Sequence, residues 1–221
     1  MRKQPSNQRS IFDADVRVES GESPDVLLDE IRKDAIACRA CTCYKHRSRP
    51  DGVVMSDGLV TAKLMVISEA PGRTEDAKGI PFTGAAGMKL NEILEWTGLV
   101  RGRDVFLCNT LKCWVGPGNP TPSAREVKAC FPLLERQIAV VRPKVICAAG
   151  NIAFKAITTE DLPMRDAHGK VFYYKKLNIP VIPTYHPSAL LRTTDPAMRD
   201  IMRKHVASDW VRVRELLNEL A

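Results

Sequence analysis

The 221-residue sequence predicts an α/β fold, a three-layer α/β/α sandwich with a mostly parallel central sheet. The first observation is a set of short segments that are apolar at every position, as is typical of strands covered on both faces of a parallel sheet. The second is that segments with apolar residues at helical spacing alternate with these strands. The third is that Gly, Pro and Asn mark the connections, where turns are expected.

The chain divides into a tail and one domain. Residues 1–22 are polar, mixed in charge and without apolar periodicity, which predicts a flexible tail. Residues 23–221 are long enough to enclose one sizeable core. The sequence shows neither a secretory leader pattern nor an apolar run of the length that crosses a membrane. We therefore expect a cytoplasmic monomer that has no membrane partner.

The first helix has clear boundary signals. Ser23 is a typical N-cap, Pro24 suits the first helical position, and apolar residues recur at helical spacing as far as about Ala37. The helix leads into a loop, residues 38–58, that is rich in cysteine and basic residues.

The strands are predicted from apolar runs. The buried strands of the sheet are expected at Leu64–Ile67, Val105–Cys108 and Lys144–Ala149. Two further strands, Gly169–Tyr174 and Val181–Tyr185, are expected to be joined by a turn near Asn178.

Helices connect these strands. Apolar spacing predicts a helix over Ala85–Trp96. Thr121-Pro122 predicts the start of a long helix that runs to about Val141, with a kink at Pro132. A short helix follows Gly150, and apolar residues at helical spacing from Pro196 onward predict a C-terminal helix that packs on the sheet.

Four cysteines are candidate metal ligands. An odd total of seven cysteines, with no secretory signal, argues against a disulfide framework. The pair Cys38-x-x-Cys41 and the wider pair Cys113 and Cys130 each span a junction of loop and helix. Four thiolates suit either Zn²⁺ or a [4Fe–4S] cluster, and the wide second pair favours the cluster, because zinc ribbons usually have two short pairs.

The other three cysteines have different interpretations. Cys108 and Cys147 lie inside apolar strands and are expected to be small buried hydrophobes. Cys43 is either a bystander or a replacement for Cys41 as a ligand, and the spacing does not decide between these.

Polar side chains follow three of the predicted strands. Glu69, Asn109 and His186 each stand at the carboxyl end of a strand, and this edge of an open α/β sheet is where ligands bind. Singly they have ordinary explanations, since a Glu is usually solvated, an Asn caps a turn and a His satisfies a backbone carbonyl. Their shared position predicts one site. Phe82, in the glycine-flanked loop 79–84, is either a stacking face for a planar ligand or a loop-packing residue.

The formal net charge of +7 bears on the partner. The first 25 residues hold four basic and five acidic residues, so they carry −1 and the rest of the chain carries +8. The basic excess therefore belongs to the folded part. It favours a polyanion such as nucleic acid, with an ordinary basic surface as the alternative.

Five motifs in order resemble the iron–sulfur uracil-DNA glycosylases, family 4 of the uracil-DNA glycosylase superfamily. The resemblance covers residues 37–192. The motifs are the CxxC at Cys38, the EAPG-x3-D segment from Glu69 with its PF-x-G-x-x-G, the CNTLKC that ends at Cys113, the TPS-x-x-E before Cys130, and HPSALLR from His186. The resemblance implies a monofunctional enzyme that hydrolyses the N-glycosidic bond of uracil in single- or double-stranded DNA and starts base excision repair, in the cytoplasm near the nucleoid.

The resemblance also implies a cofactor beside the sheet. It implies that a [4Fe–4S] cluster is held by Cys38, Cys41, Cys113 and Cys130, which decides for the cluster over zinc. We expect this cluster to have a structural role.

The resemblance implies roles for the site residues. Glu69 lies by the sugar and positions or activates the hydrolytic water, and His186 faces uracil O2, so these two are the catalytic residues. Phe82 stacks on the flipped base and Asn109 reads its edge. Within the substrate-binding loop, Ala70 and Gly72 accompany Glu75, which lies towards uracil C5 and helps to exclude the methyl group of thymine.

The segment after His186 is the implied DNA contact. Ser188 and Arg192 would touch the DNA backbone, and Leu190 or Leu191 would enter the helix as a wedge. The basic run from Lys45 to Arg49 is a second candidate for phosphate contacts.

The chain departs from the family pattern at Ser68, where the family usually has Gly. The loop 113–121 lacks the His of a related branch that is trapped covalently on abasic DNA, so ordinary turnover is expected. Two alternatives remain: a non-catalytic nucleic-acid-binding module held by a metal or cluster, and a glycosylase with broader specificity that includes hypoxanthine or xanthine.

Overall fold

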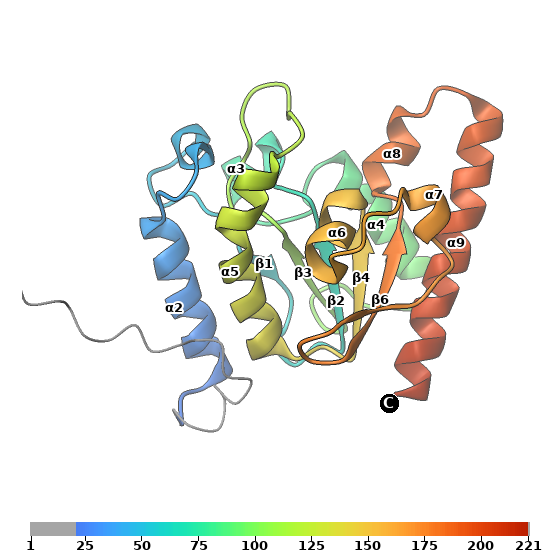
Figure 1. The fold of residues 1–221 in the computed structure, drawn as a ribbon, viewed down its shortest axis with the longest axis horizontal. Coiled ribbons are helices and arrows are strands. Elements are labelled where there is room, and N and C mark those ends of the chain that lie inside the picture. Colours follow the sequence, from blue (N-terminus) through green and yellow to red (C-terminus); the bar gives the residue numbers. More distant parts are fainter. Residues whose placement is uncertain (1–20, 221) are drawn as a thin grey trace, which may run out of the picture.

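The structure is a computed structural model that describes residues 21–220 (Figure 1). The tail expected over residues 1–22 lies almost wholly outside these described residues. The sheet has six strands in the order β1-β3-β2-β4-β6-β5. The four central strands are parallel: β2 (Leu64–Ser68), β3 (Val105–Asn109), β4 (Val145–Ala149) and β6 (Ile179–Thr184). The edge strands are antiparallel to their neighbours: β1 (Ser56–Asp57) and β5 (Phe172–Tyr174).

Helices cover both faces of the sheet, so the predicted α/β/α class is confirmed. One face carries α4 (Ala85–Trp96), α8 (Pro187–Arg192) and α9 (Pro196–Glu219). The other carries α5 (Ala124–Val141), α6 (Asn151–Thr158) and α7 (Met164–Ala167). Outside α5 lies α2 (Pro24–Ala37), as Figure 1 shows. The remaining helical turns are a 3-10 segment (Thr42–His46) and α3 (Arg73–Lys78).

Alternation along one strand explains why both faces are covered. In β2, Leu64 and Val66 belong to the core under α4 and α9, whereas Met65 and Ile67 belong to the core under α5 and α6. All four side chains are fully buried. Each such burial contributes about 1.5–3 kcal/mol, so a single strand anchors two helical layers.

The predicted boundaries hold where local signals are strong. The helices Pro24–Ala37 and Ala85–Trp96 are found at the predicted residues, and Ser23 caps the first by accepting a hydrogen bond from the Val26 N–H. The long helix was predicted from Thr121 but begins at Ala124. The reason is a capping box, in which Ser123 and Glu126 each accept a hydrogen bond from the other's backbone N–H.

The strand order places the site. After β2 the chain adds β3 on one side and then crosses to β4 on the other, so the order reverses at β2. A ligand crevice is expected at the carboxyl ends beside such a reversal. No helix among residues 21–220 is both long and apolar enough to span a membrane.

Candidate active site

A cavity of about 660 Å³ lies at the carboxyl edge of the sheet. Glu69 follows β2, Asn109 ends β3 and His186 follows β6, and the structure brings all three to this cavity. The other predicted site residues in its lining are Ala70, Gly72, Glu75, Phe82, Ser188 and Arg192. A further part of the wall, which was not predicted, is formed by Val115, Asn119 and Thr121 of the loop 113–122. That loop has no periodic signal, because Gly and Pro dominate it.

Glu69 is the acidic group of the cavity. It is half-buried, and burial raises the pKa of its carboxyl group, while the Arg192 guanidinium partly opposes this shift. A carboxyl group with a raised pKa is a better proton acceptor than a solvated one when it is ionised.

His186 has a defined tautomer. It is the N-cap of α8, and the Ser188 N–H donates to its Nδ1 over 3.1 Å, so Nδ1 is an acceptor and Nε2 carries the proton. Burial, followed by the positive charge of Arg192, lowers the pKa of His186 to about 4. The ring is therefore neutral near pH 7. Its Nε2–H is a neutral hydrogen-bond donor.

Phe82 both packs and lines the cavity, so its two interpretations are compatible. It is 5% exposed and belongs to the core under α4, yet it forms part of the cavity wall. Its backbone has a φ of +54°, which is rare for an aromatic residue. Gly87 is required beside it, because a Cβ there would lie 1.8 Å from the Phe82 carbonyl oxygen.

Arg101 holds the loop that carries Phe82, and no sequence pattern predicted this role. Its guanidinium donates to the carbonyl oxygens of Pro81 (2.8 Å) and Phe82 (2.9 Å). Its Nε also donates to Asp57 Oδ2 over 2.8 Å. These bonds satisfy two carbonyl groups of a strained loop and fix the position of the Phe82 ring.

Glu75 closes the loop that follows Glu69. Its Oε2 accepts from the Gly72 N–H (3.1 Å) and its Oε1 from the Gly84 N–H (2.8 Å), so the carboxylate bridges both ends of the loop. A Cβ at Gly72 would lie 2.6 Å from Glu75 Oε2, which explains the glycine. The structure thus gives Glu75 a positioning role. Its location towards uracil C5 stays a prediction.

Asn109 is 2% exposed and held on one side only. The Ser68 hydroxyl donates to its Oδ1, whereas its Nδ2 has no hydrogen-bond partner among the described residues. The backbone carbonyl of Asn109 accepts from the buried Lys112 Nζ over 2.5 Å. An unpaired buried amide in a cavity wall is available to a ligand acceptor.

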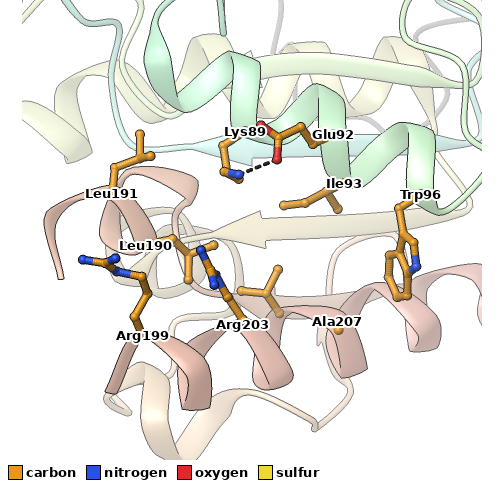
Figure 2. Close-up of a pocket in the computed structure, with 10 residues that line it drawn as sticks. Lys89, Glu92, Ile93, Trp96, Leu190, Leu191, Arg199, Arg203 and Ala207 are labelled. Atoms are coloured by element: carbon orange, nitrogen blue, oxygen red, sulfur yellow. Dashed lines mark hydrogen bonds and ion pairs between the residues drawn. The ribbon is translucent and has the colours of Figure 1, made fainter. Parts of the chain in front are cut away.

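The two leucines of α8 differ in their exposure to solvent. Leu190 is 7% exposed and packs in the core, whereas Leu191 is 48% exposed. Figure 2 shows both beside a groove between α4 and α9, with Trp96 at its far end. The prediction left open which of the two leucines is the wedge. The structure favours Leu191, because a core side chain such as Leu190 cannot leave without creating a cavity.

On the activity that the resemblance implies, replacing Leu191 by Ala should lower uracil excision from duplex DNA more than from single strands, by about tenfold, because only a duplex base must be unstacked. Single-turnover rates on both substrates measure this ratio. Leu190→Ala should instead destabilise the fold by about 2–5 kcal/mol in thermal unfolding. If the ratio of the duplex rate to the single-strand rate were unchanged in Leu191→Ala, Leu191 would not act as a wedge.

The four predicted cysteine ligands line one small pocket between the end of α2 and the start of α5. Burial raises the pKa of Cys113, and it raises the pKa of Cys130 to about 11. Two groups point N–H donors at these sulfurs: Arg47 Nε at Cys113 Sγ (3.2 Å) and the Lys112 backbone at Cys130 Sγ (3.3 Å). Buried sulfurs with such donors fit thiolate ligands that a bound metal group would keep ionised.

The arrangement of donors bears on the type of metal group. Across residues 21–220, no three His, Cys, Asp or Glu side chains converge as a single ion requires. The four predicted cysteines nevertheless line one pocket, and four thiolates suit either Zn²⁺ or a [4Fe–4S] cluster.

Cys43, Cys108 and Cys147 lie outside that pocket's lining. The Cys43 thiol donates to Glu126 Oε1 over 3.3 Å, which gives it a partner of its own and favours the bystander interpretation. Cys108 and Cys147 are fully buried in β3 and β4, as predicted. Burial raises the pKa of both thiols.

Within the basic run from Lys45 to Arg49, the Arg47 side chain is turned inward, so it is not placed for a phosphate contact. The phosphate contacts of the rest of the run stay a prediction. Besides Cys113, the Arg47 guanidinium binds the carbonyl oxygens of Ala35 and Ile36, each over 2.8 Å. The one Arg47 side chain therefore caps the C-terminus of α2 and also contacts the sulfur of Cys113.

Comparison with known proteins gives a consistent result. The profile of the Uracil DNA glycosylase superfamily matches residues 55–210. The chain is 36% identical over 196 residues to the Type-4 uracil-DNA glycosylase of Sulfurisphaera tokodaii, which covers 86% of this chain and 84% of that protein. It is 36% identical over 195 residues to the Type-4 uracil-DNA glycosylase of Archaeoglobus fulgidus, a match that covers 86% of this chain and 92% of that protein. It is 38% identical over 176 residues to the Type-4 uracil-DNA glycosylase of Pyrobaculum aerophilum, a match that covers 77% of this chain and 86% of that protein.

Proposed function

This chain belongs to the uracil-DNA glycosylase superfamily and is a uracil-excising DNA glycosylase, and from that premise we propose how its residues divide the reaction. The observation that carries the proposal is the meeting of Glu69, Asn109 and His186 from three strand ends in one cavity of about 660 Å³. A base inside a duplex is out of reach, so the deoxyuridine is flipped into this cavity.

Phe82 and Asn109 replace what the base loses on flipping. The Phe82 ring, in the cavity wall, offers a face for stacking. The unpaired Nδ2–H group of Asn109 donates to uracil O4, and Oδ1 accepts from uracil N3–H through its second lone pair. Cytosine presents the reverse pattern of donor and acceptor, so it leaves buried groups unpaired.

Glu69 and His186 stabilise the charges that develop as the bond breaks. Positive charge forms on the sugar and negative charge on uracil. The Glu69 carboxylate, on the sugar side, stabilises the first and orients the attacking water. The neutral Nε2–H of His186 donates to uracil O2 and stabilises the second. Because Ser188 holds the other ring nitrogen, this donor needs no reorientation during the reaction.

We further propose that Cys38, Cys41, Cys113 and Cys130 hold a [4Fe–4S] cluster with a structural role. When bound, the cluster would supply positive charge that keeps the four thiolates ionised, including the buried Cys113 and Cys130. The four cysteines come from the end of α2, the loop after β3 and the first half of α5, so the group ties these segments together. Arg47 and the Lys112 backbone support two of the sulfurs.

The DNA contacts are proposed at the mouth of the cavity. Arg192 lines the cavity and donates to Ser188 Oγ over 2.8 Å, which leaves other guanidinium donors for a phosphate. Leu191, exposed on α8, supplies the wedge. We propose that the enzyme acts as a monomer on single- and double-stranded DNA, in the cytoplasm at the nucleoid.

One panel of oligonucleotides tests the specificity. Each carries uracil, cytosine, thymine, hypoxanthine or xanthine at one position, and alkali reveals abasic sites as strand breaks. We expect breaks at uracil only, and none before alkali, since a monofunctional enzyme leaves the backbone intact. Binding without abasic sites would favour the non-catalytic module. Comparable cleavage at hypoxanthine or xanthine would favour the broader enzyme.

A further inference from the structure

Ser68 and Asn109 are direct neighbours in the sheet. They pair across the parallel strands β2 and β3, both at the carboxyl end, and each is 2% exposed. The Ser68 hydroxyl donates to Asn109 Oδ1. Both residues line the cavity, and Nδ2 of Asn109 has no partner in the described part of the chain.

The backbones of both residues are fixed by other bonds. The Ser68 carbonyl oxygen accepts from the Thr110 N–H (2.7 Å) and from the Thr110 hydroxyl (2.9 Å). The Asn109 carbonyl oxygen accepts from Lys112 Nζ over 2.5 Å. The freedom that remains is rotation of the Asn109 carboxamide, which exchanges Oδ1 and Nδ2. The bond from Ser68 is the side-chain contact that opposes this rotation.

The hydroxyl favours one orientation even though it can both donate and accept. In the observed orientation the Ser68 proton has an acceptor, Oδ1. After a half-turn of the amide, Nδ2 would face the Ser68 oxygen, and the buried hydroxyl proton would lose the acceptor that it has in the described residues. A buried donor without an acceptor is disfavoured by about tenfold in population.

We propose that Ser68 is a specificity-determining positioning residue, whose hydroxyl holds the Asn109 carboxamide in the orientation that pairs with uracil and not with cytosine. This inference rests on the proposed role of Asn109 as the base-reading residue. Without the hydroxyl, the two amide orientations become similar in population. The rate on uracil then falls only about twofold, whereas discrimination against cytosine falls about tenfold, because the flipped amide matches cytosine.

The test compares Ser68→Ala and Ser68→Gly with Ser68→Thr, which keeps the hydroxyl. The probes are oligonucleotides with 2′-fluoro-2′-deoxyuridine or 2′-fluoro-2′-deoxycytidine, in which the fluorine slows bond cleavage, so that Kd can be measured for each base. The ratio of the two Kd values measures the preference for uracil over cytosine. We expect this preference to fall about tenfold in Ser68→Ala and Ser68→Gly and to stay at the wild-type level in Ser68→Thr. The kcat on uracil should fall about twofold in Ser68→Ala and Ser68→Gly.

Two further variants separate positioning from general destabilisation. Thr158→Ala removes another buried hydroxyl, which bonds the Phe154 carbonyl in α6 away from the cavity. It should lower Tm without changing the Kd ratio. In an Asn109→Ala background, Ser68→Ala should have no further effect on the ratio.

A ratio that stays within twofold of wild type in Ser68→Ala, or a further narrowing in the Asn109→Ala background, would overturn the inference. These results differ from a failure of the proposed function. That failure would appear as a wild-type protein that leaves uracil oligonucleotides intact.

Discussion

Replacing Glu69 by Gln should lower the single-turnover rate of uracil excision by about 10²–10⁴-fold while DNA affinity stays within about twofold. Glutamine keeps the shape of the side chain and removes its charge. The loss therefore falls on the transition state, where the sugar becomes positive, and not on the binding of the uncharged ground-state sugar. Rates with enzyme in excess, together with Kd on a 2′-fluoro substrate, separate the two effects.

The pH profile gives a second check on Glu69. Burial raises the pKa of this carboxyl group, and the proposed mechanism uses its ionised form. The rate should therefore fall as the pH falls through that raised pKa. Protonation of His186 does not account for this decline, because burial lowers its pKa to about 4, so that its ring is still neutral at the pH where the Glu69 carboxylate begins to be protonated. Glu69→Gln should lack the acid limb of the profile.

A matched control uses a carboxylate outside the cavity. Glu92 in α4 is exposed and pairs with Lys89 outside the cavity. Glu92→Gln should keep both the rate and the acid limb. If Glu69→Gln retained a rate within tenfold of wild type, the carboxylate would have no part in the mechanism.

Replacing Cys113 by Ser should remove the absorbance near 400 nm that a [4Fe–4S] cluster gives, and with it much of the stability. Because metal binding free energy is folding free energy, we expect a loss of about 5 kcal/mol or more from a total of about 5–15 kcal/mol. Absorbance spectra and denaturant unfolding of the purified variant measure both effects. Chelation of the wild-type protein should give the same unfolding.

Cys43→Ala is the matched control for this experiment. Cys43 lies close in sequence to Cys41 but bonds Glu126 and does not line the cysteine pocket. This variant should keep the full absorbance near 400 nm. A colourless wild-type protein with one bound zinc would contradict the cluster, and a cluster-free protein that stays folded and active would contradict its structural role.

The elements that were predicted correctly are those whose signals are local. Ser23 and Pro24 mark a helix start without help from the rest of the chain, and the first four residues of β2 are apolar because both of its faces are buried. Three short helices were missed. α3, α7 and α8 are too short to show periodicity, and α3 depends on Glu75, which bonds Gly72 and the more distant Gly84.

The site was predictable as far as strand ends define it. Glu69, Asn109 and His186 each follow an apolar run, so their meeting required only a parallel sheet. The bond from Ser68 to Asn109 depends on the register of β2 against β3, which the sequence does not specify. The inward turn of Arg47 likewise depends on how α2 lies beside the loop after β3.

Lys112 has a consequence for anyone who redesigns this enzyme. It is 1% exposed, lines the cysteine pocket, and donates to the Asn109 carbonyl over 2.5 Å, while its own backbone N–H points at Cys130. Within four residues, the chain passes from Asn109, the proposed base-reading residue, to Cys113 of the cysteine pocket. Attempts to graft a new base preference onto this strand end must therefore keep the cysteine framework intact, and libraries that randomise residues 110–112 will mostly select for folding instead of for chemistry.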